Sequence, residues 1–134
     1  MNDIELVSGF KMPLLGLGTW NLEGSACEET VRKALDLGYR HIDTAHMYGN
    51  QRAVGAGLRS SGVKRDEVFV TTKIWRDSLA YDKVHRQFDA CLEMLAMDYV
   101  DLLLIHWPDE SVPLAETLKA FDEIAASGRA QSIG

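Results

Sequence analysis

Apolar residues occur along this chain in two alternating patterns. Short, nearly continuous apolar runs are predicted to be strands, and longer segments with an apolar residue every three or four positions are predicted to be amphipathic helices. The strands are expected at residues 14–18, 41–44, 68–73, 100–106 and 130–134, and the helices at 25–37, 52–60, 82–95 and 114–126. Strand and helix therefore alternate over almost the whole chain.

The helical segments carry signals at their ends and along one face. Ser25 is expected to cap the first helix, because Glu28 follows three residues later as in a capping box. Gly38 and Gly128 are expected to end the first and last helices, since glycine readily adopts the left-handed conformation found there. Gly55-Ala56-Gly57 lies inside a helical pattern without a preceding strand, so a dinucleotide-binding loop is not expected. The predicted buried face of the third helix consists of Val84, Phe88, Cys91, Leu92 and Leu95.

The spacing of the strands predicts the fold class. Successive strands begin about 30 residues apart, the size of a right-handed βαβ unit, so the sheet is expected to be parallel. Eight such units form a (β/α)8 TIM barrel of about 250 residues. We therefore predict an α/β fold, the N-terminal half of a TIM barrel with four units and the start of a fifth strand. It would form a single partial domain over residues 1–134, with a β-hairpin at residues 1–13. A flavodoxin-like open sheet of five strands is the alternative.

Composition and charge narrow the function classes. The chain has 14 basic and 20 acidic residues, a formal net charge of −6, which argues against nucleic acid or an anionic membrane as a partner. No apolar run reaches the roughly 18 residues of a membrane span. The first residues lack the pattern of a signal peptide, so a cytoplasmic protein is expected. Cys27 and Cys91 lack metal-ligand spacing, so we expect buried or half-buried thiols and no disulfide or metal site.

Three ionisable residues stand at the carboxyl ends of consecutive predicted strands. They are Asp43, Lys73 and His106, and Tyr48 lies in the loop that follows Asp43. In parallel α/β folds this rim is where ligands bind and catalysis occurs. Neighbouring strands lie about 4.8 Å apart, so side chains at adjacent strand ends can meet. The sequence therefore predicts that a carboxylate, an ammonium, an imidazole and a phenol converge at one point.

These four residue types suit the reduction of a carbonyl group. The reaction needs a hydride at carbon, which no side chain supplies and which implies a nicotinamide cofactor. It also needs a proton at oxygen. A neighbouring ammonium makes the proton of a phenol easier to release. We expect Tyr48 to donate that proton beside Lys73, with Asp43 holding Lys73 charged and oriented. A neutral His106 would orient the carbonyl oxygen.

Ordered motifs along the chain resemble those of the aldo-keto reductase family. The motifs are Gly16-Leu17-Gly18-Thr19-Trp20, His41-Ile42-Asp43-Thr44-Ala45 with Tyr48-Gly49-Asn50, Thr71-Thr72-Lys73-Ile74-Trp75, Asp98-Tyr99-Val100-Asp101-Leu102 with His106-Trp107-Pro108, and Gly128-Arg129 through Ile133-Gly134. The likeness covers essentially all of the chain and is greatest to the compact bacterial branch that includes the diketogluconate reductases. It implies an NADPH-preferring reductase of small aldehydes and ketones.

The resemblance also implies roles for individual residues. The catalytic tetrad positions match Asp43, Tyr48, Lys73 and His106. The positions beside the nicotinamide match Thr19, Trp20 and Asp43. The substrate-pocket positions match Trp20, Tyr48, Trp75, His106 and Trp107. Among the other histidines, His41 and His85 are expected to be structural, whereas His46 could be structural or face the pocket.

The chain departs from the family pattern at three places. Gln51 replaces the usual glutamate, a change expected to affect only local helix hydrogen bonding. Ala96-Met97 replaces a turn that usually contains glycine. Beyond Ile133-Gly134 the family continues into the residues that hold the carboxamide, the nicotinamide ring and the adenosine phosphate, so most of the NADPH site is expected outside this chain. The alternative function is a half-barrel fragment without independent activity, which self-associates through its exposed strand edges.

Overall fold

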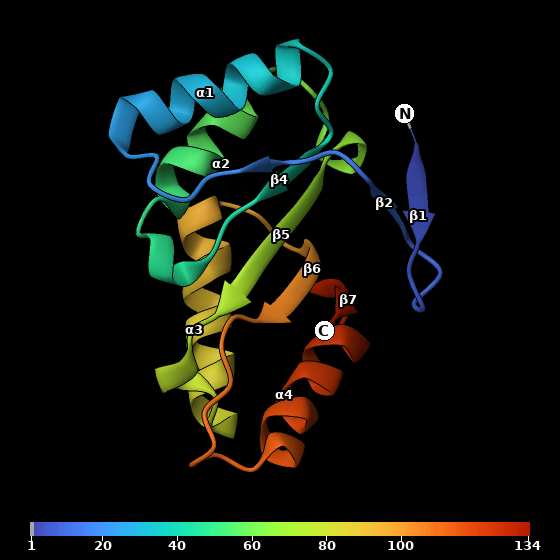
Figure 1. Cartoon of the computed structure of the whole chain (residues 1–134), viewed down its shortest axis with the longest axis vertical. Helices are drawn as coiled ribbons and strands as arrows, with labels where there is room; N and C mark the ends of the chain where they lie inside the picture. Colours follow the sequence, from blue (N-terminus) through green and yellow to red (C-terminus); the bar gives the residue numbers. More distant parts are fainter. Residues whose placement is uncertain (1) are drawn as a thin grey trace.

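The computed structural model describes residues 2–134 and contains a hairpin followed by alternating parallel strands and helices (Figure 1). The hairpin consists of β1 (Asp3–Glu5) and β2 (Lys11–Pro13). The parallel strands are β3 (Leu17–Gly18), β4 (His41–Asp43), β5 (Phe69–Ile74), β6 (Val100–Ile105) and β7 (Ala130–Ile133). The helices are α1 (Gly24–Asp36), α2 (Gln51–Ser60), α3 (Tyr81–Leu95) and α4 (Leu114–Ala126), with 3-10 turns η1 (His46–Tyr48), η2 (Arg65–Glu67) and η3 (Arg76–Ser78).

The order of the strands distinguishes the two predicted fold classes. Neighbours in the sheet follow the chain order β3-β4-β5-β6-β7, and each neighbouring pair is parallel. In a flavodoxin-like sheet the second strand lies outside the first, and helices cover both faces. Right-handed crossovers in sequential order place the helices on one face instead. Figure 1 shows α1, α2 and α3 along one side of the strands. The half-barrel prediction is confirmed, and the open-sheet alternative is wrong.

The hydrophobic core lies between the sheet and its helices. The predicted apolar face of α3 is buried along its whole length, and Phe88 at its centre is among the largest fully buried side chains. Phe121 of α4 packs into the same core. Cys27 and Cys91 are buried free thiols, as predicted. Among residues 2–134, no helix is long and apolar enough to cross a membrane.

Two glycines allow α2 to lie very close to its neighbouring helices. A Cβ atom added at Gly55 would lie 2.3 Å from the backbone oxygen of Leu95, at the end of α3. A Cβ atom added at Gly57 would lie 2.6 Å from the backbone oxygen of Glu28 in α1. Both glycines are inside α2, so they serve helix packing and do not form a nucleotide loop. The helix that follows Tyr48 is therefore held closely between α1 and α3.

The first parallel strand is shorter than predicted. β3 contains only Leu17 and Gly18, whereas Leu14 and Leu15 are 62% and 60% exposed. The backbone amide of Leu14 bonds to the carbonyl of Asn2, so this part of the chain extends the hairpin instead of the sheet. The predicted strand at 14–18 is therefore wrong in its first half.

The first helix begins earlier than its predicted cap allows. α1 starts at Gly24, and the amide of Cys27 bonds to the carbonyl of Glu23. Ser25 therefore lies inside the first turn, and the capping role predicted for it is wrong. The predicted end is confirmed, because Gly38 follows the helix with a φ of 98°, in the left-handed region.

The hairpin is tied to the last strand of the sheet. β1 and β2 pair in antiparallel register, as predicted for the beginning of the chain. The Ser8 hydroxyl, in the hairpin turn, lies 2.6 Å from the Ser132 hydroxyl of β7. The hairpin and β7, at the two ends of the described chain, are therefore joined directly.

Ala96 ends α3 in a backbone conformation that favours glycine. Its φ is 54°, and its amide bonds to the carbonyl of Glu93. Glycine at this position removes the steric cost of the Cβ atom, so we expect Ala96→Gly to raise the free energy of unfolding by about 1 kcal/mol. Urea denaturation measures the change. The control is Ala126→Gly in the last turn of α4, which should lower the free energy of unfolding by up to about 1 kcal/mol. A lower urea midpoint for Ala96→Gly would contradict the prediction.

Candidate active site

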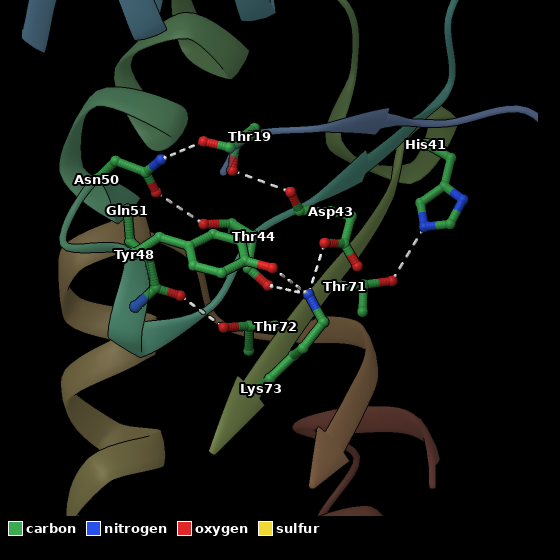
Figure 2. Close-up of polar contacts among 10 residues, drawn as sticks. All are labelled: Thr19, His41, Asp43, Thr44, Tyr48, Asn50, Gln51, Thr71, Thr72 and Lys73. Atoms are coloured by element: carbon green, nitrogen blue, oxygen red, sulfur yellow. Dashed lines mark hydrogen bonds and ion pairs between the residues drawn. The ribbon is translucent and has the colours of Figure 1, made fainter. Parts of the chain in front are cut away.

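The predicted site residues lie at the carboxyl ends of β4, β5 and β6. Asp43 is the last residue of β4, and Lys73 is the last but one of β5. His106 directly follows β6, where its amide bonds to the carbonyl of Ile74. Tyr48 ends the 3-10 turn η1, which follows β4. Figure 2 shows the carboxylate of Asp43 and the phenol of Tyr48 directed toward the ammonium of Lys73.

Lys73 is the centre of this group, and its side chain is only 12% exposed. Its Nζ donates to Asp43 Oδ1 at 2.5 Å, to the Thr44 carbonyl at 3.1 Å and to the Tyr48 hydroxyl at 3.2 Å. A lysine ammonium has three hydrogens and no acceptor, so all three donors have partners. The Tyr48 oxygen must therefore accept from Lys73. The hydrogen of the phenol is left free for another acceptor.

His106 lies beside the same phenol. Its ring centroid is 5.5 Å from that of Tyr48 and 5.2 Å from that of Trp75, in edge-to-face geometry. Burial lowers the pKa of His106, the Lys73 ammonium lowers it further, and Asp43 opposes the shift. The imidazole is therefore neutral at neutral pH and carries a single N–H. Its buried Nδ1 has no hydrogen-bond partner among the described residues.

A cleft of about 370 Å³ lies beside the phenol and the imidazole. Its lining residues are Trp20, Met47, Tyr48, Trp75, His106 and Trp107. All five residues predicted for the substrate pocket line this cleft, and the Trp20 ring lies 5.0 Å from the Tyr48 ring. Met47 was missed, because a methionine in a short turn has no sequence signal of its own. No lysine or arginine is among the lining residues, so the cleft suits an uncharged group with an apolar surface.

The other histidines lie outside the cleft. His46 lines a separate hollow next to α3, so the pocket role left open for it is not supported. Both ring nitrogens of His41 have partners, the Pro13 carbonyl and the Thr71 hydroxyl. His85 packs edge to face against a tyrosine of its own helix. Within residues 2–134, no group of three or more potential metal ligands is present.

Buried polar residues behind the cleft connect its loops. The Asn50 side chain, 4% exposed, bonds to the Thr19 carbonyl and to the Thr44 hydroxyl. Thr19 is fully buried, and its hydroxyl donates to the Asp43 carbonyl. Its side chain thus supports the backbone of Asp43, and the cofactor contact expected for Thr19 stays a prediction. The supporting role of Asn50 was missed, although the residue belongs to a recognised motif.

Gln51 makes a contact beyond its own helix. Its side chain is 1% exposed, and its Oε1 accepts the hydroxyl hydrogen of Thr72 at 2.6 Å. This bond joins the start of α2 to β5. The expectation that Gln51 affects only local helix hydrogen bonding is therefore wrong, because the residue faces the sheet and not the solvent.

Known proteins are similar to this chain over its whole length. The aldo/keto reductase family pattern matches residues 14–134. The chain belongs to the aldo/keto reductase family. It is 42% identical to the 9,11-endoperoxide prostaglandin H2 reductase of Trypanosoma cruzi and 39% identical to the glyoxal reductase of Bacillus subtilis. These alignments cover 99% and 98% of this chain but 47% and 48% of the two relatives. The chain thus spans about half the length of the relatives it matches.

Solved structures of aldo/keto reductases share the fold. The enzyme from Brucella melitensis has a TM-score of 0.94 at 41% identity, covering 99% of this chain and 52% of that one. A putative 2,5-diketo-D-gluconic acid reductase B has a TM-score of 0.89 at 40% identity, covering 95% of this chain and 44% of that one. The fold therefore matches the N-terminal half of an aldo/keto reductase barrel. Since relatives with different names have similar identities, the expected likeness to diketogluconate reductases stays a prediction.

Proposed function

We propose that this chain provides the acid–base half of an enzyme that reduces aldehydes and ketones to alcohols with NADPH. One observation carries the proposal: the Lys73 ammonium contacts both the Asp43 carboxylate and the Tyr48 hydroxyl beside an aromatic cleft. This geometry leaves the phenol hydrogen free to be donated. Family membership adds support, because the relatives include named reductases.

In the proposed mechanism Tyr48 gives its proton to the carbonyl oxygen of the substrate. The Lys73 ammonium stabilises the negative charge that develops on the phenol oxygen, and Asp43 keeps the ammonium in place. His106, neutral, donates its N–H to the same carbonyl oxygen and holds it near the phenol. The cofactor, when bound, supplies the hydride that the carbonyl carbon accepts. The product alcohol thus gains one hydride at carbon and one proton at oxygen.

The residues present fit only one end of the proposed cofactor. The cleft has an aromatic lining without cations, which suits an uncharged nicotinamide ring. Trp20 and Asp43 would lie beside that ring. Phosphate groups need basic residues or helix N-termini, and the cleft lining supplies neither. We therefore propose that a further segment, outside this chain, binds the phosphates. We also propose a cytoplasmic location, with which the two free thiols are compatible.

The test compares the chain alone with a fusion of the chain to the second half of the Bacillus subtilis glyoxal reductase. We expect the fusion to consume NADPH in the presence of an aldehyde and to release the alcohol. NADPH fluorescence reports binding in both proteins. A folded fusion that binds NADPH and produces no alcohol would contradict the proposal. If the chain alone leaves the fluorescence unchanged up to millimolar NADPH, independent catalysis by the chain is ruled out.

The alternative function, a fragment that associates without turnover, also has structural support. Within the described residues β3 and β7 each have a strand neighbour on one side only. Leu114 and Leu118, one turn apart on α4, are 60% and 38% exposed. We propose that the isolated chain covers these apolar surfaces by self-association.

We expect the isolated chain to behave as a dimer or larger species in light scattering at micromolar concentration, with a mass of at least twice 14.9 kDa. Unpaired strand edges and apolar helix surface both favour contact between copies. Leu118→Glu should shift the distribution toward the monomer, because it places a charge on the exposed apolar surface of α4 that Leu114 and Leu118 form. A monodisperse wild-type monomer would rule out the association.

A further inference from the structure

Asn50 is a buried amide at the junction of two of the loops that line the cleft. Its Nδ2 donates to the Thr19 carbonyl at 2.7 Å and to the Leu22 carbonyl at 3.0 Å, both in the segment between β3 and α1. Its Oδ1 accepts the hydroxyl hydrogen of Thr44 at 2.9 Å, directly after β4. Figure 2 shows the amide of Asn50 directed toward Thr19 and Thr44, with a dashed line to each. One side chain therefore joins the β3–α1 segment to the β4–η1 segment.

Each of these two segments carries one wall of the cleft. Trp20 follows Thr19, and its ring lies 5.0 Å from the ring of Tyr48, which belongs to the other segment. Thr44 also carries the carbonyl that accepts the Lys73 ammonium at 3.1 Å. The Asn50 bonds thus bear on two contacts of the phenol, its packing against Trp20 and the position of the ammonium.

Only an amide satisfies the partners that surround Asn50. Two carbonyl oxygens need donors, and one hydroxyl needs an acceptor, which an asparagine side chain supplies together. An aspartate would place a carboxylate against the two carbonyl oxygens. A leucine would leave the buried Thr19 carbonyl, the partly buried Leu22 carbonyl and the buried Thr44 hydroxyl without this partner, and the loss is costly for the two buried groups.

We infer that Asn50 is a positioning residue, which holds Trp20 against Tyr48 and fixes the carbonyl of Thr44 that receives Lys73. The relevance of this role to catalysis rests on the proposed function. The hydrogen bonds of Asn50 are independent of that proposal. Asn50 is not one of the residues that line the cleft, and the hydrogen bonds of the ammonium go to Asp43, Thr44 and Tyr48. It acts on the phenol through the two segments that it connects.

The experiment measures nuclear Overhauser cross-peaks between the Trp20 indole and the Tyr48 ring by NMR. We expect Asn50→Leu to reduce these cross-peaks at least twofold. The matched control is Gln51→Leu, which removes the neighbouring buried amide. Gln51 is bonded to Thr72 and to neither cleft segment, so its loss should lower stability while leaving the cross-peaks unchanged. If Asn50 only contributed to stability, Asn50→Leu and Gln51→Leu would have the same effect on the Trp20–Tyr48 cross-peaks.

A second variant covers the case in which Asn50→Leu does not fold. Thr44→Val preserves the shape of the side chain and removes only the hydroxyl that bonds to Asn50. Thr44→Val should change the chemical shifts of the Tyr48 ring, because Lys73 contacts both Thr44 and Tyr48, and it should preserve the Trp20–Tyr48 cross-peaks. Asn50→Asp keeps the acceptor for Thr44 but loses the donors to Thr19 and Leu22, so it should reduce the cross-peaks. Unchanged cross-peaks in Asn50→Asp, or equal losses in Gln51→Leu, would overturn the inference.

Activity measurements separate this inference from the proposed function. In the glyoxal reductase fusion, Asn50→Asp should lower kcat. Gln51→Leu should not lower kcat when both variants are assayed at a temperature where they are fully folded. A fusion without turnover would count against the reductase proposal alone, since the NMR comparison needs no reaction. Reduced cross-peaks with an unchanged kcat would show that the held geometry is not used in catalysis, which would overturn the catalytic part of the inference.

Discussion

Tyr48→Phe is expected to lower kcat/KM for aldehyde reduction about 10²–10⁴-fold, the usual contribution of a positioned proton donor. The substitution removes the only hydroxyl in the cleft lining and leaves the ring that packs against Trp20. The carbonyl oxygen then lacks the proton that the free phenol hydrogen would supply. The assay follows NADPH consumption by the glyoxal reductase fusion at several aldehyde concentrations.

A matched control removes a tyrosine hydroxyl elsewhere in the chain. Tyr81→Phe breaks a 2.5 Å hydrogen bond to Glu123, between α3 and α4, and should leave kcat/KM unchanged. Fluorescence titration of NADPH should give similar Kd values for the wild type and Tyr48→Phe, because the phenol proton acts on the substrate oxygen. Turnover by Tyr48→Phe close to that of the wild type would show that the proton donor is another group.

Gly55→Ala is expected to lower the free energy of unfolding by about 2–3 kcal/mol, the size of a marked overpacking effect. Alanine in a helix is otherwise favoured over glycine by about 0.5–1 kcal/mol. The added Cβ atom would lie 2.3 Å from the backbone oxygen of Leu95, which is too close without movement of α2 or α3. That oxygen also accepts a hydrogen bond from Arg59 at 3.0 Å, which such a movement would strain. The steric cost therefore exceeds the gain in helix propensity.

The control for this prediction makes the same substitution where space is open. A Cβ atom added at Gly18 meets no atom within 4 Å, so Gly18→Ala should change stability by no more than about 0.5 kcal/mol. Urea denaturation curves for the three proteins provide the comparison. Gly55→Ala with the stability of the wild type would show that the helices adjust easily, and that close packing of α2 does not hold the segment after Tyr48.

The secondary structure was largely predictable because its signals are local. α4 has the predicted bounds, Leu114–Ala126, since both the apolar period and the following Gly128 lie within the segment. The meeting of Asp43 and Lys73 was also predictable, because the carboxyl ends of adjacent parallel strands share one edge. Five of the residues that line the cleft were predictable too, because they follow strand ends at this edge and match pocket positions of the family.

The exact extent of elements was less predictable where distant segments compete for the same backbone. Leu14 and Leu15 have the composition of a strand, but the amide of Leu14 pairs with Asn2 in the hairpin. The order of the strands likewise required the folded chain. Five strands at regular spacing are compatible with an open sheet or a half-barrel, and only the observed pairings separate the two.

The residues proposed to carry the chemistry could thus be named from the pattern of the chain, whereas those that hold them in place could not. Asn50 and Thr19 are 31 positions apart, and the residues next to each one do not indicate whether its side chain is exposed or buried. Their bond exists because folding brings two loops together and excludes water from the gap between them. Periodicity is a property of neighbouring residues, but the satisfaction of a buried amide depends on atoms that are close only in space.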